Sequence, residues 1–217
     1  MVVAPPVTRG LVCFDVDGTL VPGTSSCAWV AAALGHEAEL VAAEAAYVAG
    51  ELTNQEASVI DARGWAGHTE AEVLARLATL PLVDGIAETV AWCRDHDLRP
   101  ILTTLAWTPV GRLLAGRFGF AAYCGPVPEA ESGRYTGNVA EHLDEFGKRD
   151  FALAQGFAPE RCAAIGDSRS DLPLFAAVGT SIAFNGTPAA RAVATHVVDG
   201  PDLRAVIPVL AAQFSSV

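Results

Sequence analysis

Short apolar segments that alternate with helical ones constrain the fold of this chain more than any other feature. Each is short enough for a buried strand and is followed by a polar or glycine-containing turn. The expected strands are residues 11–14, 98–103, 121–124, 162–165, 181–184 and 196–198. Alternation of this kind is typical of α/β proteins with a parallel sheet. Ligands bind such sheets beyond the carboxyl ends of the strands, so the residues after each strand are the first candidates for function.

Residues 24–80 interrupt this alternation. The segment is rich in alanine, its larger apolar residues recur at helical spacing, and it contains almost no strand-like run. We therefore expect a Rossmann-like α/β core of residues 1–21 and 81–217, with a small all-helical cap at residues 22–80 inserted after the first strand. The core would also contain helices at 84–96, 109–118, 141–155, 171–177 and 201–213 and a hairpin tip at 132–137.

Composition and charge exclude several classes of protein. Hydrophobic residues make up 51% of the 217 residues and charged residues 18%, which provides material for a core and excludes general disorder. The long uncharged stretch at residues 18–36 contains proline, glycine and hydroxyl residues, so we expect no membrane span. A net charge of −11 without a basic cluster argues against nucleic-acid binding.

The compartment predicted from the sequence is the cytoplasm. The first ten residues, MVVAPPVTRG, lack the basic start and apolar run of a signal peptide. The five cysteines are far apart and form no CxxC pair, which favours buried thiols over disulfides. The sequence gives no indication of the oligomeric state.

Acidic, hydroxyl and amide side chains follow the expected strands, at what would be one edge of the sheet. They are Asp15 and Asp17 after the first strand, Thr103 and Thr104 after the next, then Asp167 with Asp171, and finally Asn185. The chain otherwise carries its positive charge on arginine, and its single lysine, Lys148, precedes the strand that ends at Asp167. Because arginine cannot replace a compact ammonium, we interpret Lys148 as a site residue.

The chemistry of this set can be argued from the side chains alone. Several carboxylates in one crevice repel one another and need a cation, and oxygen ligands without histidine or cysteine suit Mg²⁺ better than zinc. A hydroxyl, an ammonium and backbone N–H groups are the donors that a phosphoryl group requires. A carboxylate beside them can attack phosphorus and form an aspartyl-phosphate. These side chains therefore predict Mg²⁺-dependent phosphoryl transfer.

Four segments, in order, resemble the motifs of the haloacid dehalogenase-like superfamily. Residues 14–20, FDVDGTL, are similar to its first motif, and residues 166–171, GDSRSD, to its fourth motif, GDxxxD. Between them, Thr104 resembles the hydroxyl residue of the second motif and Lys148 the lysine of the third. The helical insert and the hairpin at 133–137 resemble the phosphoserine phosphatase-like group. The resemblance covers nearly the whole chain and implies a phosphatase with a helical cap of the C1 type.

The resemblance assigns catalytic and metal-binding roles to four carboxylates. Asp15 would be the nucleophile and a Mg²⁺ ligand. Asp17 would be the general acid and then the general base, with its backbone carbonyl on the metal, and the acid role predicts a raised pKa. Asp167 would bind the metal, and Asp171 would support the metal site or Lys148.

A second group would hold the phosphate of a small-molecule phosphomonoester. We assign Thr104 and Lys148 to this role, with Gly18 and Asn185 beside them. Thr103 is the alternative to Thr104 because both lie at the second motif. Asn185 has a second interpretation, as a turn residue next to Gly186.

The expected cap differs from that of phosphoserine phosphatases. Those enzymes place a glutamate in the segment equivalent to residues 21–26, where it holds the substrate amino group, whereas no acid lies between Asp17 and Glu37 here. Residues 59–63 also offer no clear match to their cap arginine. We expect Asp61 and Arg63 to be surface charges, with contact to the substrate from the cap as the alternative. This argues against phosphoserine and leaves open a sugar phosphate, another phosphorylated hydroxy acid or amino acid, or an intermediate of specialised metabolism.

Other functions remain open at this stage. A phosphotransferase would pass the same aspartyl-phosphate to an alcohol, and an inactive module would bind a ligand or partner without catalysis. Protein phosphatase activity is disfavoured because a sizeable cap suits small substrates. The tryptophans at 29 and 65 are expected to serve packing, and the histidines to lie at the surface or to cap helices.

Overall fold

A parallel sheet occupies the centre of the core. The computed structural model describes residues 8–215, so most of the segment used to predict the absence of a signal peptide lies outside the described residues. Within them the strands run in the order β2-β1-β5-β6-β7, all parallel. The strands are β1 (Gly10–Phe14), β2 (Leu98–Leu102), β5 (Cys162–Gly166), β6 (Thr180–Phe184) and β7 (His196–Val198). This arrangement confirms the α/β fold.

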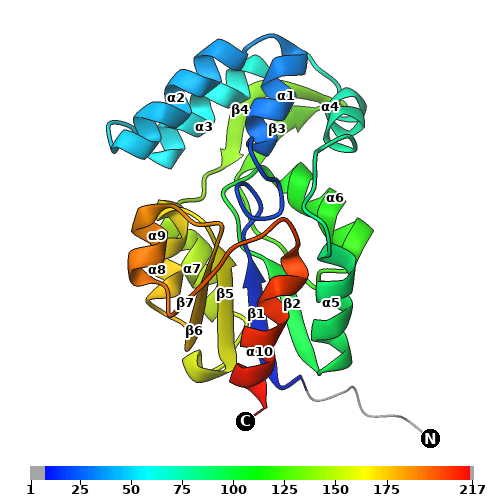
Figure 1. The fold of residues 1–217 in the computed structure, drawn as a ribbon. Coiled ribbons are helices and arrows are strands. Elements are labelled where there is room, and N and C mark those ends of the chain that lie inside the picture. The colour runs from blue at the N-terminus through cyan, green and yellow to red at the C-terminus, as the bar shows by residue number, and fades with distance from the viewer. Residues whose placement is uncertain (1–7, 216–217) are drawn as a thin grey trace, which may run out of the picture.

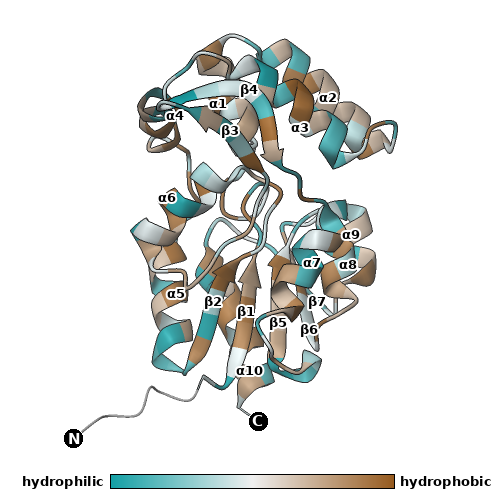
Figure 2. Ribbon diagram, turned by 180° about the vertical axis from the view of Figure 1, so that it is seen from behind, coloured by the Kyte–Doolittle hydropathy of each residue, from teal (hydrophilic) through white to brown (hydrophobic). Residues whose placement is uncertain are grey.

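Both faces of strand β1 are buried, and its residues alternate between two hydrophobic clusters. Val12 and Phe14 pack with helices α5, α6 and α10, whereas Leu11 and Cys13 pack with α7, α8 and α9. The first group comprises α5 (Ile86–Asp95), α6 (Thr108–Phe118) and α10 (Ile207–Phe214), and the second α7 (Glu145–Leu153), α8 (Leu172–Phe175) and α9 (Pro188–Val193). Hydrophobic residues accordingly concentrate in the central strands (Figure 2). Burial on both faces explains why the strands are continuously apolar.

The carboxyl ends of the central strands lie at one level. Phe14, the last residue of β1, pairs with Leu102 of β2 and with Ile165 of β5. The loops that follow these strands therefore meet above the same edge of the sheet. Short 3₁₀ turns, η1 (Pro159–Arg161), η2 (Arg169–Asp171) and η3 (Leu203–Val206), complete the core.

The helices predicted for residues 24–80 lie above that edge (Figure 1). They are α1 (Ser26–Leu34), α2 (Glu37–Ala49), α3 (Asn54–Gly64) and α4 (Glu70–Leu77). Ser25, Thr53 and Thr69 cap α1, α3 and α4 through their side-chain oxygens, which satisfies N–H groups that a helix leaves unpaired. No helix in the described part of the chain has the length and apolarity needed to cross a membrane.

The hairpin of β3 (Val127–Glu131) and β4 (Arg134–Glu141) lies beside these helices, although the sequence assigned residues 81–217 to the core (Figure 1). The Gly67 N–H donates to the Tyr135 carbonyl, and the Tyr135 N–H donates to the His68 carbonyl. These two bonds join β4 to the connection between α3 and α4. The turn is shorter than expected, since only Ser132 and Gly133 separate the strands, both with positive φ. The proposed domain limits are sequence-based and stay a prediction.

Other differences from the expected elements are local. Residues 121–124 form a single bridge, between Leu102 and Tyr123, in place of a strand. Helix α9 was not predicted, because its six residues are too few for a helical period to be recognised. The five cysteines are unpaired as predicted; four of them are buried and Cys27 is partly buried.

Candidate active site

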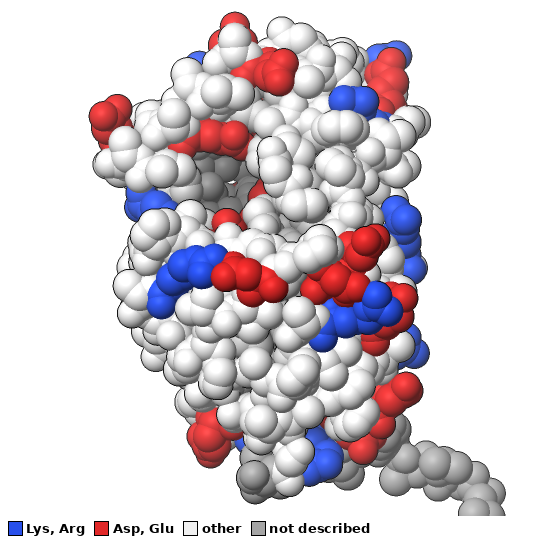
Figure 3. Space-filling view, in the orientation of Figure 1, with Lys and Arg blue, Asp and Glu red and all other residues white. Residues whose placement is uncertain are grey.

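A cavity of about 250 Å³ lies between the sheet edge and the cap helices. Figure 3 shows a hollow between the two parts of the molecule, with acidic side chains at its rim and on its floor. The core contributes the loops after β1, β2 and β5, and the cap contributes α1, α2 and α3. The lining residues used below are Asp15, Asp17, Thr104 and Trp107 from the core and Ser25, Glu44 and Asp61 from the cap.

Lys148 lies between two buried carboxylates beneath this cavity, and one of them, Asp15, lines it. Its Nζ donates to Asp15 Oδ1 at 2.8 Å and to Asp171 Oδ1 at 2.5 Å, and its side chain is 0% exposed. Burial by itself would lower the pKa of Lys148, but the two carboxylates raise it well above its usual range. The only lysine of the chain is therefore held as a cation at the site that the sequence indicated.

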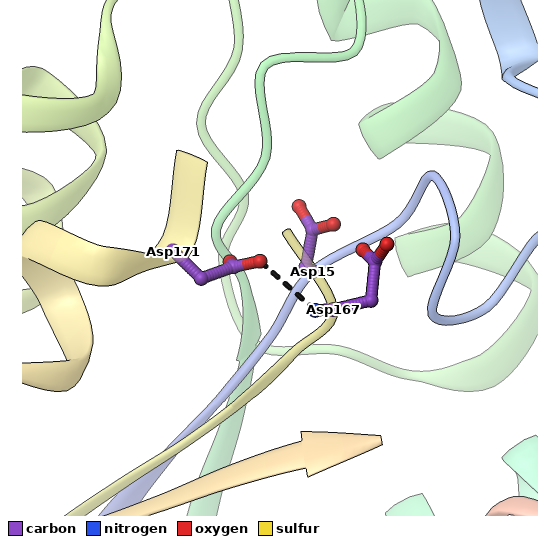
Figure 4. A group of neighbouring side chains, drawn as sticks. All are labelled: Asp15, Asp167 and Asp171. Carbon is purple, nitrogen blue, oxygen red and sulfur yellow. Dashed lines mark hydrogen bonds between the residues drawn. The ribbon is translucent and has the colours of Figure 1, made fainter. Parts of the chain in front are cut away.

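Asp171 positions the loop after β5 as well as Lys148. Its Oδ2 accepts hydrogen bonds from the backbone N–H groups of Asp167 and Ser168, at 3.0 and 3.1 Å. Figure 4 shows Asp15, Asp167 and Asp171 grouped at the ends of the strands, with the bond from the Asp167 backbone to Asp171. Because both Asp171 oxygens already accept hydrogen bonds, Asp171 suits support of a metal site better than direct ligation.

Asp167 has the opposite character. Its Oδ1 is buried and has no hydrogen-bond partner among the described residues, and burial together with Asp171 raises the pKa of Asp167 to about 7. A Cβ added to Gly18 would lie 2.3 Å from Asp167 Oδ2, and Gly18 has a φ of +85°. Glycine is therefore required there by both the backbone and the close approach of Asp167.

This carboxylate group fits a divalent cation with oxygen ligands. One oxygen from each of Asp15, Asp167 and Asp171 lies within 4.8 Å of the others. Burial, together with Asp171 and Asp167, raises the pKa of Asp15 against the opposing effect of Lys148, so a further cation here would stabilise the ionised carboxylate. Carboxylate oxygens without nitrogen or sulfur are the ligands that Mg²⁺ prefers.

Asp17 joins the first core loop to the first cap helix. Its Oδ1 accepts from the Ser26 backbone N–H at 2.6 Å and its Oδ2 from the Ser26 hydroxyl at 3.0 Å. Burial raises the pKa of Asp17 to about 6, although the bonds from Ser26 lower it. This is the direction that an acid working near neutral pH needs.

Of the two adjacent threonines, Thr104 lines the cavity and Thr103 does not. The Thr104 hydroxyl accepts a hydrogen bond from the backbone N–H of Ala106 at 3.0 Å. Its own proton is therefore available to a ligand. Thr103 is 0% exposed and its backbone N–H bonds to Phe14, so it belongs to the end of the sheet.

The structure does not bring Asn185 into this group. Its side-chain amide donates to and accepts from the backbone of Gly200, at 2.8 and 2.9 Å, and its φ is +50°. Assigning Asn185 to the phosphate is therefore corrected to its alternative, a turn residue. Gly18 adjoins the metal-binding group, but its N–H donates to Val21 O, so its part there is to make room for Asp167.

Asp61 is buried, contrary to the expectation of a surface charge. It is 2% exposed, and its Oδ2 accepts from Trp107 Nε1 at 2.6 Å. Its Oδ1 lies 2.7 Å from His36 Nε2 and accepts from Trp65 Nε1 at 3.2 Å. His36 is buried too, against Gly64, where any Cβ would collide with its ring. The burial of Asp61 was not predicted, because a lone aspartate on a helix usually lies at the surface. His36 does occupy the capping position before α2, but its side chain bonds to Asp61 and makes no cap hydrogen bond.

Glu44 of α2 is the second cap carboxylate at the cavity and was not predicted. Its Oε1 accepts from the Ser25 hydroxyl at 2.6 Å, and burial raises its pKa. Glu44 lies beyond the acid-free stretch between Asp17 and Glu37, from which the absence of such a glutamate was inferred. No sequence signal marks Glu44, because the folding of α2 back over α1 decides its position.

Comparisons with known proteins show the family to which this chain belongs. A family model described as haloacid dehalogenase-like hydrolase matches residues 12–176. The phosphoserine phosphatase of Halobacterium salinarum is 31% identical over 198 residues, covering 88% of this chain and 93% of that protein. The phosphoserine phosphatase of Albidiferax ferrireducens is 29% identical over 217 residues, with 92% and 90% covered.

Solved structures show the same fold. The structure described as a phospho-aspartyl intermediate analogue of phosphoserine phosphatase superposes with a TM-score of 0.83 at 21% identity. It covers 93% of this chain and 99% of that one. A substrate-bound phosphoserine phosphatase complex gives the same TM-score at 20% identity.

Proposed function

Because this chain belongs to the haloacid dehalogenase-like hydrolase family and is a phosphatase of its phosphoserine phosphatase-like group, we propose that it hydrolyses a small phosphomonoester. The reaction would pass through an aspartyl-phosphate on Asp15, with Mg²⁺ as cofactor. The observation that carries the proposal is Lys148, held at 2.8 Å from Asp15, which lines the cavity, and at 2.5 Å from Asp171. A buried ammonium between two carboxylates orients Asp15 and adds positive charge where a phosphoryl group would lie.

In the first step an oxygen of Asp15 attacks phosphorus while the bond from phosphorus to the ester oxygen breaks. Asp17 donates its proton to the departing alkoxide, for which its raised pKa is suited. Lys148 and the Thr104 hydroxyl donate to the phosphoryl oxygens. In the second step Asp17, now ionised, takes a proton from water, and the hydroxide displaces Asp15 to release phosphate.

Asp15, Asp167 and the backbone carbonyl of Asp17 would hold Mg²⁺. When bound, the ion supplies positive charge that stabilises the phosphoryl oxygens in the transition state. Asp171 would keep Asp167 and Lys148 in place through the three hydrogen bonds that it accepts. We place the reaction in the cytoplasm, consistent with the five unpaired cysteines.

The test is phosphate release from p-nitrophenyl phosphate and a panel of phosphomonoesters, with Mg²⁺ or with EDTA. Asp15→Asn should abolish turnover and leave the fold intact by circular dichroism, because the amide cannot act as the nucleophile. Asp150→Asn is the matched control, since Asp150 is exposed on the same helix as Lys148. Substantial activity in Asp15→Asn would refute the assignment. Formation of a new ester with an added alcohol, in place of free phosphate, would identify a transferase.

A further inference from the structure

The cap side of the cavity is acidic and contains no cation. Glu44 and Asp61 both line it, and no lysine, arginine or histidine is among the lining residues in the described part of the chain. Of the cations near it, Lys148 lies beneath the phosphoryl end, between Asp15 and Asp171, and Arg169 lies outside the lining, where it contacts Tyr47 and Glu145. A substrate carboxylate at the cap end would therefore face two carboxylates with no cationic side chain among the lining residues of the described chain, which is unfavourable in a partly buried site.

The two cap carboxylates differ in what they can still bind. Asp61 has both oxygens occupied, by Trp107 on one and by His36 and Trp65 on the other. Glu44 uses one oxygen, which accepts from Ser25. The hydrogen bonds of the described residues thus leave Glu44 as the cap carboxylate with capacity for a ligand.

Glu44 also lies on the side of the leaving group. Ser25 and Ser26 are consecutive at the start of α1, and Ser25 bonds to Glu44 while Ser26 bonds to Asp17. Asp17 is the residue that would protonate the leaving oxygen. A group attached to that oxygen by a short carbon chain would reach Glu44.

We propose that this cavity selects a phosphomonoester whose leaving group carries an ammonium and no carboxylate, and that Glu44 recognises the ammonium. The proposal rests on the proposed hydrolase function and adds the substrate class, a small phosphorylated amino alcohol. An ammonium would donate to the second oxygen of Glu44. It would also replace the hydration that Glu44 loses by partial burial.

Three esters with the same two-carbon chain test the proposal. Phosphoethanolamine ends in an ammonium, 2-hydroxyethyl phosphate in a hydroxyl and phosphoglycolate in a carboxylate, and p-nitrophenyl phosphate reports hydrolase activity separately. We expect kcat/KM for the ammonium ester to exceed that for the hydroxyl ester by about tenfold or more, as for a hydrogen bond between charged groups. Phosphoglycolate should be the poorest of the three.

Glu44→Gln keeps the shape of the side chain and removes its charge, so the kcat/KM values for the ammonium ester and the hydroxyl ester should become nearly equal. Glu39→Gln is the matched control, because Glu39 is exposed on the same helix, and should keep the preference. Equal rates for the three wild-type reactions, a preference for the hydroxyl or carboxylate ester, or an unchanged preference in Glu44→Gln would overturn the proposal. Hydrolysis of p-nitrophenyl phosphate alone would overturn it too and leave the hydrolase function standing.

Calorimetric binding of the same esters to Asp15→Asn separates the two proposals. This variant binds without turnover, so its preference does not depend on catalysis. Tighter binding of phosphoethanolamine than of the other two esters, lost when Glu44→Gln is added, supports the substrate class. If the wild type then hydrolyses neither phosphoethanolamine nor p-nitrophenyl phosphate, it is the hydrolase function that fails. Binding without preference would overturn the substrate class whatever the rates.

Discussion

The two ends of the cavity hold buried carboxylates in different ways. At the core end, Asp15 and Asp171 share the ammonium of Lys148, and all three side chains are at most 5% exposed. At the cap end, Asp61 is satisfied by ring N–H groups of two tryptophans and by His36. Within residues 8–215, the hydrogen-bond donor to Glu44 is a single serine hydroxyl.

Because of this difference, the two ends of one cavity favour substrate groups of different charge. The core end has a fixed cation and a group of carboxylates that suits Mg²⁺, so it can accept an anionic phosphoryl group. The cap end offers hydrogen-bond acceptors and negative charge, so it favours a neutral or cationic leaving group. Each prediction below breaks one of these arrangements.

Removing the Lys148 ammonium should have the largest effect. Lys148→Met leaves two buried carboxylates without their cation and should lower the free energy of unfolding by about 3–5 kcal/mol, as well as abolishing turnover. Urea unfolding in EDTA measures the first effect, and added Mg²⁺ should restore part of the loss by binding the native state. Arg149→Met is the control, because Arg149 is the next residue and pairs at the surface with Asp150. Equal stability of the two variants would contradict the role of the ion pairs.

Asp61→Asn tests the cap end and should cost less. The new side-chain amide would place an N–H group against one of the donors from which Asp61 now accepts. The buried donor left without an acceptor should lower the free energy of unfolding by about 1–3 kcal/mol. Unfolding followed by tryptophan fluorescence measures it, since Trp65 and Trp107 both donate to this side chain. Combining it with Trp107→Phe should give less than the sum of the single effects. Full additivity would show that the bond between the core loop and the cap contributes nothing.

The pH dependence of stability should report the raised pKa of Asp17, which follows β1 of the core and accepts hydrogen bonds from Ser26 of the cap. Its pKa is raised to about 6 in the fold, above the roughly 3.9 of an unfolded chain. The contribution of this raised pKa to the free energy of unfolding is therefore fully present below about pH 4 and is lost as pH rises through about 6. We expect Asp17→Asn to become more stable relative to wild type over that window, with a constant difference at higher pH. A difference that does not change with pH would contradict the raised pKa.

Arg169→Gln should have the smallest effect on stability. Arg169 extends from the loop after β5 to the end of α2, where it donates to Tyr47 O, lies 4.6 Å from the Tyr47 ring centroid and approaches Glu145 at 3.6 Å. Because it is partly exposed, its loss should cost about 0.5–1 kcal/mol, with a several-fold rise in KM from a looser cap. Arg191→Gln is the control, since Arg191 pairs with Asp199. An unchanged KM would show that this contact does not hold the cap.

The core end of the site could be predicted because its residues follow strands. Asp15 and Asp17 directly follow β1 and Asp167 follows β5, and parallel pairing brings those ends together. Asn185 also follows a strand, yet its amide bonds to Gly200. Position after a strand therefore places a residue at the edge of the sheet but does not decide which way its side chain turns.

The cap end could not be predicted, because its residues are brought to the cavity by helix packing. Ser25 and Glu44 are nineteen positions apart, and Asp61 and Trp107 forty-six. Helical periodicity predicts that a segment is helical and where its apolar face lies. It does not predict which polar residue of one helix meets which residue of another.

The amino-acid sequence by itself determined the α/β class, the helical insert, the family and the carboxylates with their single lysine, because these depend on local patterns and on residues placed at strand ends. Three features required the folded structure: the acidic cap end of the cavity, the joint burial of Asp61 and His36, and the position of the hairpin beside the cap helices. The physical reason is that burial and charge compensation depend on which distant side chains meet, and a polar residue shows no sign of its partner until the chain is folded.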